Sequence, residues 1–377
     1  MKKTHIWLLI AGLLIVLGGL VFVMSALFAG WNFKELLGGK FLTRTYDVAE
    51  DFSSIELKTD TADITFLPAE DGVCKIVSYN RERVTDTPVV DNGKLTVNTV
   101  DGRKWYERMF GFGAPTLTVY LPKSEYAALV ISEDTGDISV PKDFSFEGVD
   151  ISRSTGDVQF LASVSGNVKI KGSTGATYVG QITAASLEIT VSTGRVSVSG
   201  LTCAGDLSVK VSTGDVKISD ATCQSLHTTG DTGDMDMENI TVRGNISAQR
   251  STGRIALRNA NCAGNIEIRV STGKTELTDV TCQNLVSKGS TGKVVLQNVI
   301  ANAQISIERS TGDVRFDACD AAELFVTTDT GDVKGSLRSE KVFIARTDTG
   351  HVDVPKTITG GRCEITTDTG DIHITVG

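Results

Sequence analysis

Aspartates near the end of the chain recur at a spacing that could build a cation site. Two residues before the glycine of three successive Thr-Gly pairs stand Asp329, Asp348 and Asp368. If the segments that carry them stack, the carboxylates lie about 5 Å apart and repel one another unless a cation binds them or water screens them. Calcium bound by these three carboxylates is therefore one hypothesis. The favoured alternative is a row of hydrated aspartates in Asx-type turns.

No other group of residues has the spacing of a catalytic or metal centre. The four histidines are scattered, and none belongs to a nucleophile or ligand motif. The sequence also lacks a phosphate-binding glycine loop, an HExxH segment and a CxxC pair. We therefore predict no catalytic residue and no cofactor apart from the hypothetical calcium. One enzymatic alternative stays open, because a β-helix can gather carboxylates from adjacent turns into a polysaccharide-cleaving groove.

The C-terminal two-thirds of the chain is a repeat. A Thr-Gly pair, usually followed by Asp, Lys or Arg and then Val or Ile, recurs every 19 or 20 residues. The thirteen glycines are Gly136, Gly156, Gly175, Gly194, Gly214, Gly233, Gly253, Gly273, Gly292, Gly312, Gly331, Gly350 and Gly370. A period this regular indicates a stack of equal units rather than one globular core.

Each unit has the pattern of two strands that flank a Thr-Gly corner. In the unit 187–206, apolar and polar residues alternate on both sides of Gly194, which is typical of strands with one buried face. An antiparallel meander and a parallel coil both fit two strands per unit. We favour the coil because equivalent positions keep the same character, as like-on-like stacking requires. The predicted fold is all-β, a parallel β-solenoid (β-helix) of about 13 regular rungs.

Four cysteines support this stacking. Cys203, Cys223, Cys262 and Cys282 each follow a corner glycine by nine residues, where other units have Ser, Ala or Val. A column that accepts only small side chains is predicted to be buried in the core. Disulfides between neighbouring rungs stay open as an alternative, although parallel Cβ vectors suit them poorly.

The N-terminus predicts a single membrane span. Residues 6–28 carry no charge and are long enough to cross a bilayer, and Lys2 and Lys3 precede them. The positive residues favour a cytoplasmic tail at 1–5, a transmembrane anchor at 6–28 and an extracytoplasmic rod. A cleaved signal segment is the alternative.

The remaining boundaries follow from composition. We expect a linker at 29–45, degenerate rungs with an aromatic capping insertion at 46–130, and regular solenoid repeats at 131–377. The insertion carries Trp105, Tyr106, Phe110 and Phe112, which would close the end of the core or contact the bilayer or a partner. The chain stops in a strand-like segment at 372–376, so a C-terminal rung with an open edge could support end-to-end self-association.

Several of these segments together resemble a known bacterial family. Tyr120-Leu-Pro-Lys123 leads into Glu133-Asp-Thr-Gly-Asp-Ile138, and Arg153-Ser-Thr-Gly-Asp-Val158 begins the serial copies. This arrangement over residues 47–377 is similar to the DUF4097 family, whose members are described as adhesins with a β-strand repeat. The resemblance implies a β-helical protein of the cell envelope. It supplies no catalytic residues, and some relatives are associated with envelope-stress systems.

Composition and charge narrow the function. The net charge is −9, aromatic residues make up 6%, and basic residues form no stripe, so nucleic acid is not an expected partner. The favoured hypothesis is a non-enzymatic, membrane-anchored binding, adhesin-like or scaffold protein whose partner is an envelope protein or glycan. The alternative is a sensory or regulatory partner of an envelope-stress membrane protein.

Overall fold

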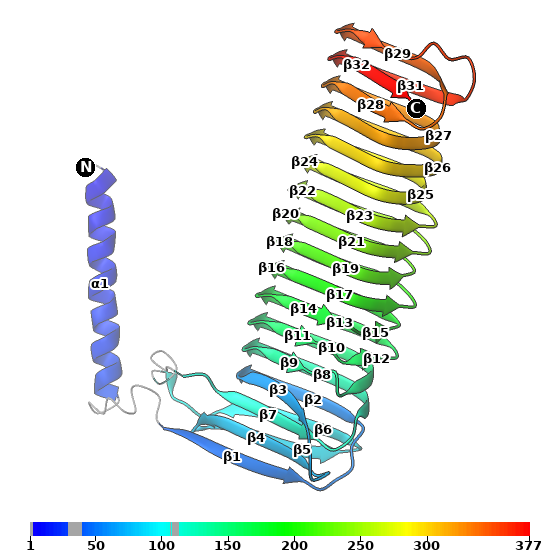
Figure 1. The fold of residues 1–377 in the computed structure, drawn as a ribbon. Coiled ribbons are helices and arrows are strands. Elements are labelled where there is room, and N and C mark those ends of the chain that lie inside the picture. The colour runs from blue at the N-terminus through cyan, green and yellow to red at the C-terminus, as the bar shows by residue number, and fades with distance from the viewer. Residues whose placement is uncertain (1–2, 29–39, 106, 108–112) are drawn as a thin grey trace.

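The chain forms one apolar helix and a long β-solenoid. The computed structural model describes residues 3–28, 40–105, 107 and 113–377. About 70% of the chain is strand, and the solenoid has about 12 turns, which confirms the predicted fold class (Figure 1). Here each turn is called a rung.

Helix α1, Lys3–Phe28, precedes the solenoid. Its segment Ile10–Phe28 is long and apolar enough to cross a membrane. Leucine and isoleucine side chains are exposed along it, among them Leu13, Leu14 and Ile15. Among the helix residues whose burial is described, Ser25 and Ala26 near its end are buried.

Each regular rung consists of a strand, a Thr-Gly corner, a second strand and a second corner. Strands β16 (Ser186–Thr193) and β17 (Val196–Cys203) belong to one rung, and β18 (Leu207–Thr213) and β19 (Val216–Cys223) to the next. Val191 lies beside Val211, and Val196 beside Val216, both in parallel register. This pairing confirms the parallel coil and rules out the antiparallel meander.

The other rungs repeat this plan in regular order. The earlier strands are β8 (Glu125–Thr135), β9 (Ile138–Val140), β10 (Ser145–Thr155), β11 (Val158–Phe160), β12 (Ser163–Val164), β13 (Asn167–Thr174), β14 (Thr177–Gly180) and β15 (Thr183–Ala184). The later strands are β20 (Leu226–Thr232), β21 (Met235–Val242), β22 (Ile246–Thr252), β23 (Ile255–Cys262), β24 (Asn265–Thr272), β25 (Thr275–Thr291), β26 (Val294–Thr311) and β27 (Val314–Thr330). In β25, β26 and β27 the second corner is continuous strand, so each of these elements joins two rungs.

The inward side chains of every rung join in one continuous apolar core. All seven cysteines are buried in it and none forms a disulfide, so the predicted cysteine column is confirmed and its disulfide alternative is not. Burial raises the pKa of the Cys223 and Cys282 thiols to about 12, so both are protonated and unreactive at neutral pH.

Three arginines are also buried inside the solenoid, namely Arg153, Arg250 and Arg309. Each lies beside a glycine of the adjacent rung, which leaves room for the guanidinium: Gly172, Gly230 and Gly289 respectively. Arg250 donates from Nη1 to the carbonyl of Val211 and from Nη2 to that of Gly214, both at 3.0 Å. The charged groups are therefore tolerated because main-chain carbonyls accept their hydrogen bonds.

The N-terminal end of the solenoid is closed by antiparallel strands rather than by further rungs. Strands β2 (Ser54–Thr61) and β3 (Asp63–Pro68) stack in parallel between β8 and β9 on one side and β6 (Lys94–Asp101) and β7 (Thr116–Leu121) on the other. Strand β5 (Val84–Asp91) then pairs antiparallel with β6, β4 (Cys74–Arg81) with β7, and β1 (Phe41–Val48) with β4. The degenerate rungs expected at 46–130 are thus only partly rungs.

Strand β1 begins inside the segment 29–45 that we expected to be a linker. It pairs with β4 over its whole length, from Phe41 beside Arg81 to Val48 beside Cys74. This pairing orders residues that the sequence alone gave no reason to assign to a strand.

The C-terminal rungs are not stacked in chain order. Strand β31 (Gly361–Thr369) lies between β27 and β29 (Lys341–Thr349), and β32 (Ile372–Val376) lies between β28 (Val333–Leu337) and β30 (Val352–Asp353). Figure 1 shows β29 at the far end of the stack, beyond β31 and β32.

The expectation that the C-terminal rung has the open edge is therefore wrong, because that rung has neighbours on both sides. Its inward side chains Cys363 and Ile365 are fully buried, whereas the equivalent inward side chains of β29, Phe343 and Ala345, are only half-buried. The last rung of the chain is covered, and the open edge belongs to β29. Self-association through a free strand at this end of the rod therefore uses the edge of β29.

The corner glycines give a direct test of this stacking. A Cβ added to Gly214 would lie 1.9 Å from the carbonyl oxygen of Gly194, and the φ of Gly214 is 136°. We predict that Gly214→Ala lowers the free energy of unfolding by at least about 2 kcal/mol, measured by urea unfolding of the full chain in detergent. Gly148→Ala is the matched control, because its Cβ would meet nothing within 4 Å. Equal effects of the two substitutions would contradict the stacking.

Candidate functional site

The aspartate after each corner glycine has a structural task. Its Oδ1 accepts the main-chain N–H of the equivalent residue in the next rung, for example from Asp157 to Asp137 at 2.7 Å and from Asp234 to Asp215 at 3.1 Å. The same bond joins Asp371 to Asp332 at 2.8 Å across the interleaved rungs. The Thr-Gly-Asp motif therefore satisfies a backbone donor that the corner would otherwise leave unpaired.

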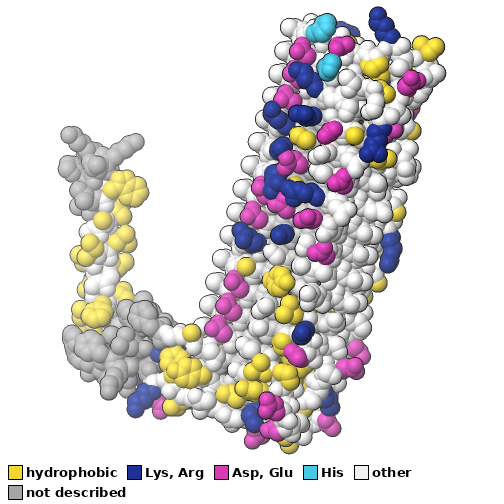
Figure 2. Space-filling view, in the orientation of Figure 1, with side chains coloured by type: hydrophobic (Ala, Val, Ile, Leu, Met, Phe, Trp, Pro, Cys, Tyr) yellow, Lys and Arg dark blue, Asp and Glu magenta, His cyan; other side chains and the backbone are white. Residues whose placement is uncertain are grey.

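In the middle of the rod, lysine or arginine replaces this aspartate and forms ion pairs along the corner. Arg254 lies 2.8 Å from Asp236 and 3.3 Å from Glu276, and Lys293 lies 2.9 Å from Asp313. Figure 2 shows Lys, Arg, Asp and Glu side chains gathered along one edge of the rod and on the face beside it. Most of these charges neutralise one another across neighbouring rungs.

The three aspartates of the calcium hypothesis lie in consecutive rungs, but in the order Asp329, Asp368, Asp348. All three are exposed, and Asp348 accepts a hydrogen bond from Arg346 at 3.1 Å. Within the residues that the structure describes, no group of three or more His, Cys, Asp or Glu side chains could hold a metal ion. Calcium binding therefore stays a prediction, and no cluster of ligands among the described residues supports it.

A hollow of about 650 Å³ opens on the face formed by β26, β27, β28 and β32. It lies over Gly335, at a position where neighbouring rungs place the buried side chains of Leu296 and Phe316. A Cβ on Gly335 would lie 1.9 Å from the carbonyl oxygen of Phe316, so no side chain fits there. We call this feature the distal hollow, since it lies toward the end of the rod remote from the cap.

Arg315 has a different electrostatic setting from the other cations of the distal hollow. Lys293 lies 2.9 Å from Asp313, and Lys334 lies 2.7 Å from Asp332. In the described part of the chain, no carboxylate lies within ion-pair distance of Arg315, which is exposed between Val295 and Lys334. The hollow therefore offers one guanidinium whose charge is not neutralised.

Two carboxylates of the distal hollow, Asp313 and Asp332, are stabilised in their charged form. The Lys293 hydrogen bond lowers the pKa of Asp313, and the Lys334 hydrogen bond lowers the pKa of Asp332. A glycosidase needs one carboxylic acid whose pKa is raised so that it can protonate the leaving group. These two groups have the opposite shift, which suits binding better than acid catalysis.

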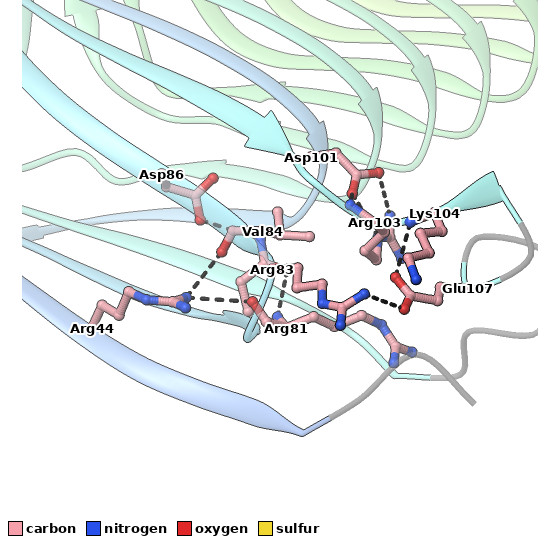
Figure 3. Close-up of polar contacts among 10 residues, drawn as sticks. Arg44, Arg81, Arg83, Val84, Asp86, Asp101, Arg103, Lys104 and Glu107 are labelled. Atoms are coloured by element: carbon pink, nitrogen blue, oxygen red, sulfur yellow. Dashed lines mark hydrogen bonds and ion pairs between the residues drawn. The ribbon is translucent and has the colours of Figure 1, made fainter. Parts of the chain in front are cut away.

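A second polar region lies in the cap and holds the start of the aromatic insertion (Figure 3). Arg83 donates to Glu107 at 2.6 Å, and the other carboxylate oxygen of Glu107 accepts the main-chain N–H of Lys104 at 2.9 Å. Arg103 forms a two-point contact with Asp101, with both N–O distances at 2.9 Å. These bonds tie Arg103, Lys104 and Glu107 to the start of β5 and the end of β6.

Of the four contact residues predicted in the insertion, the structure describes one, Trp105. Trp105 is 49% exposed, and its ring lies edge-on to that of Phe28, with 6.2 Å between the centroids. The insertion thus meets the end of α1. Tyr106, Phe110 and Phe112 lie outside the described residues.

A buried carboxyl group lies where the cap meets the regular rungs. Glu133 is 2% exposed, and its Oε1 accepts the main-chain N–H of Ala62 at 3.1 Å. Its Oε2 and the hydroxyl of neighbouring Thr59 have no hydrogen-bond partner in the described part of the chain. Burial raises the pKa of Glu133 to about 8, which the N–H groups of Ala62 and Thr135 oppose.

Comparison with known proteins identifies the family. The model of Toastrack DUF4097 matches residues 52–272 and 259–377, which together span most of the chain. The chain belongs to the Toastrack DUF4097 family. The resemblance drawn from the Thr-Gly-Asp copies is thereby confirmed, and no curated protein matches.

Several solved structures are similar to this Toastrack chain at low sequence identity. A "putative adhesin" of Bacteroides fragilis is 16% identical, with a TM-score of 0.28, over 74% of this chain and 97% of its own. A "putative adhesin" of Parabacteroides merdae is 12% identical, with a TM-score of 0.31, over 72% and 96%. A "putative cell adhesion protein" of Clostridium sporogenes is 8% identical, with a TM-score of 0.18, over 90% and 100%.

The distal hollow was not predicted, although the sequence carries a signal for it. Gly335 stands four residues after corner glycine Gly331, where the other twelve units have Val, Ile, Leu, Met or Phe. Aligning the Toastrack repeats by their corners shows this gap. Arg315 has no such signal, because whether its charge is neutralised depends on side-chain positions in three rungs.

The raised pKa of Glu133 predicts a pH dependence of stability. The folded state holds this proton more tightly than the unfolded state, whose pKa is near 4.5, so stability is greatest below that pH and falls as the pH rises through about 8. We expect Glu133→Gln to flatten the fall of melting temperature between pH 5 and 8. Glu147→Gln, which changes an exposed carboxylate, should leave it intact. An unchanged slope in Glu133→Gln would contradict the assignment.

Proposed function

We propose that this Toastrack protein is a non-enzymatic binding protein of the cell envelope, anchored in the membrane by α1. The proposal rests on one observation: the apolar helix and the distal hollow lie at opposite ends of the molecule. A helix with exposed apolar side chains adjoins the cap, and a charged face with the distal hollow lies many rungs away. Such an arrangement suits a protein that carries a recognition surface remote from its anchor.

In this proposal, the charges next to the membrane span determine on which side of the membrane the rod lies. Lys2 and Lys3 precede the span and favour a cytoplasmic N-terminus, which leaves the solenoid outside the cytoplasm. The rod is acidic overall, with its charges spread along the outer columns of the rungs. A partner is therefore expected to be recognised by a local surface and not by the total charge.

The contact between the insertion and α1 favours a second candidate function. Phe28 meets Trp105, and the Arg83–Glu107 pair fixes the segment that carries this tryptophan. A membrane protein that pairs with α1 could sense the position of the cap through this contact. In that case the protein is a regulatory partner of an envelope-stress membrane protein.

The binding function predicts retention on envelope polymer. Full-length protein in detergent micelles should co-sediment with purified cell-wall sacculi and leave them intact, because the outward columns bind without cleaving. The measurement is the bound fraction, together with the release of soluble sugar. A detergent-solubilised single-span protein of similar size serves as the control. Release of sugar would contradict the non-enzymatic assignment, and no retention would contradict wall binding.

Replacing the span separates the two candidates. In the binding function, exchange of residues 6–28 for an unrelated anchor leaves sacculus retention unchanged, because α1 then serves only as a tether. In the regulatory function, the same exchange and Trp105→Ala both abolish signalling in an envelope-stress reporter strain. Val100→Ala, which removes another exposed apolar side chain of the cap, is the control. A reporter that responds normally to both changes excludes the regulatory function.

A further inference from the structure

At the distal hollow, the residues depart from the pattern that the other rungs repeat. Gly335 leaves the inward column without a side chain, and in the described part of the chain Arg315 has no carboxylate within ion-pair distance, although Asp313 and Asp317 line the same hollow. Both departures fall in adjacent rungs and line the same hollow. We propose that the distal hollow binds an acidic glycan, with Arg315 holding a phosphate or carboxylate group of the polymer.

The charge arrangement selects an anionic ligand. Arg315 and Lys334 are direct neighbours in parallel register, and like charges at this spacing destabilise a sheet. Asp332 and Asp371 lie 2.7 Å and 3.8 Å from the ammonium of Lys334, so that charge is balanced. Only the guanidinium of Arg315 stays unbalanced, and an anion bound there removes the repulsion. A guanidinium also binds phosphate or carboxylate at two points, which fixes the orientation of the ligand.

The outward columns suit a linear polymer. Val295, Arg315, Lys334 and His373 follow one another along the axis of the solenoid, about 4.8 Å apart. Thr375 and Ser336 line the same hollow and offer hydroxyl groups for the sugar hydroxyls. A chain that lies along the axis therefore meets the guanidinium of Arg315, the paired ammonium of Lys334 and the hydroxyl groups of Ser336 and Thr375 in successive rungs.

The inference rests on the proposed binding function and names its ligand class. The test uses the full chain in detergent micelles and three soluble polymers of matched length: poly(glycerol phosphate), polygalacturonate and neutral dextran. Calorimetric titration should detect binding of at least one of the two acidic polymers, weakened by raised salt, and no binding of dextran. Comparison of the titrations with poly(glycerol phosphate) and polygalacturonate decides whether phosphate or carboxylate is preferred. Arg315→Gln should weaken that binding at least tenfold.

Arg243→Gln is the matched control, because it removes the same charge from an exposed arginine outside the hollow. It should leave the affinity unchanged, and both variants should keep the melting temperature of the parent. Equal weakening by the two substitutions, or dextran binding as tightly as the acidic polymers, overturns the assignment of this site. Failure of every polymer together with retention on sacculi also overturns the acidic-glycan proposal but leaves the proposed function standing. Absence of both polymer binding and sacculus retention refutes the acidic-glycan proposal together with the proposed function.

Discussion

The contact between corner glycines of successive rungs determines the geometry of this solenoid. At each regular corner a Cβ would lie between 1.8 and 2.3 Å from a carbonyl oxygen of the rung beside it, so the backbone approaches closer than any side chain permits. All thirteen glycines also have φ between 122° and 157°, a region that favours glycine. The corners therefore align, and the strands on either side must pair in parallel and in register. The continuous core and the outward columns are consequences of that register.

The same stacking distinguishes charged groups that are paired within the solenoid from charged groups that can bind a ligand. Aspartates after the corner accept a backbone N–H, and lysines or arginines at the same place pair with carboxylates of adjacent rungs. Because the stack satisfies its charges locally, an unneutralised group on the surface is informative. Arg315 is such a group, and its side chain is exposed on the outer face of the solenoid. Function is thus most readily sought where the repeat is broken.

The sequence was sufficient to predict the rungs, the buried cysteines and the parallel pairing, because each follows from residue type at a 19–20-residue period. The order of the last rungs could not be predicted. Asp348-Thr-Gly and Asp368-Thr-Gly are the same corner, so either rung fits equally well against the rung of Gly331. The choice depends on the connecting segment 354–360 and on how fully each rung fills the core. The antiparallel cap was missed for a related reason, since alternating strands do not reveal their direction.

The buried arginines show what a closer comparison of the repeats can detect. Gly172, Gly230 and Gly289 occupy a column that elsewhere has Val, Thr, Glu or Arg, and each is adjacent to one arginine. Pairs of this kind are compensating changes in volume between rungs. They follow from the repeat alignment alone, whereas the pKa of Glu133 and the isolation of Arg315 require side-chain positions.

The most direct test of the stacking is a pair of spin-label distances. Labels at Lys217 and His373 are separated by seven rungs, and labels at Lys217 and Asp353 by eight. All native cysteines are buried, so introduced cysteines at these exposed positions can be labelled selectively. Pulsed electron paramagnetic resonance should give about 34 Å for the first pair and about 38 Å for the second. The reverse order would show that the rungs follow the chain, and two distances far from these values would contradict parallel stacking itself.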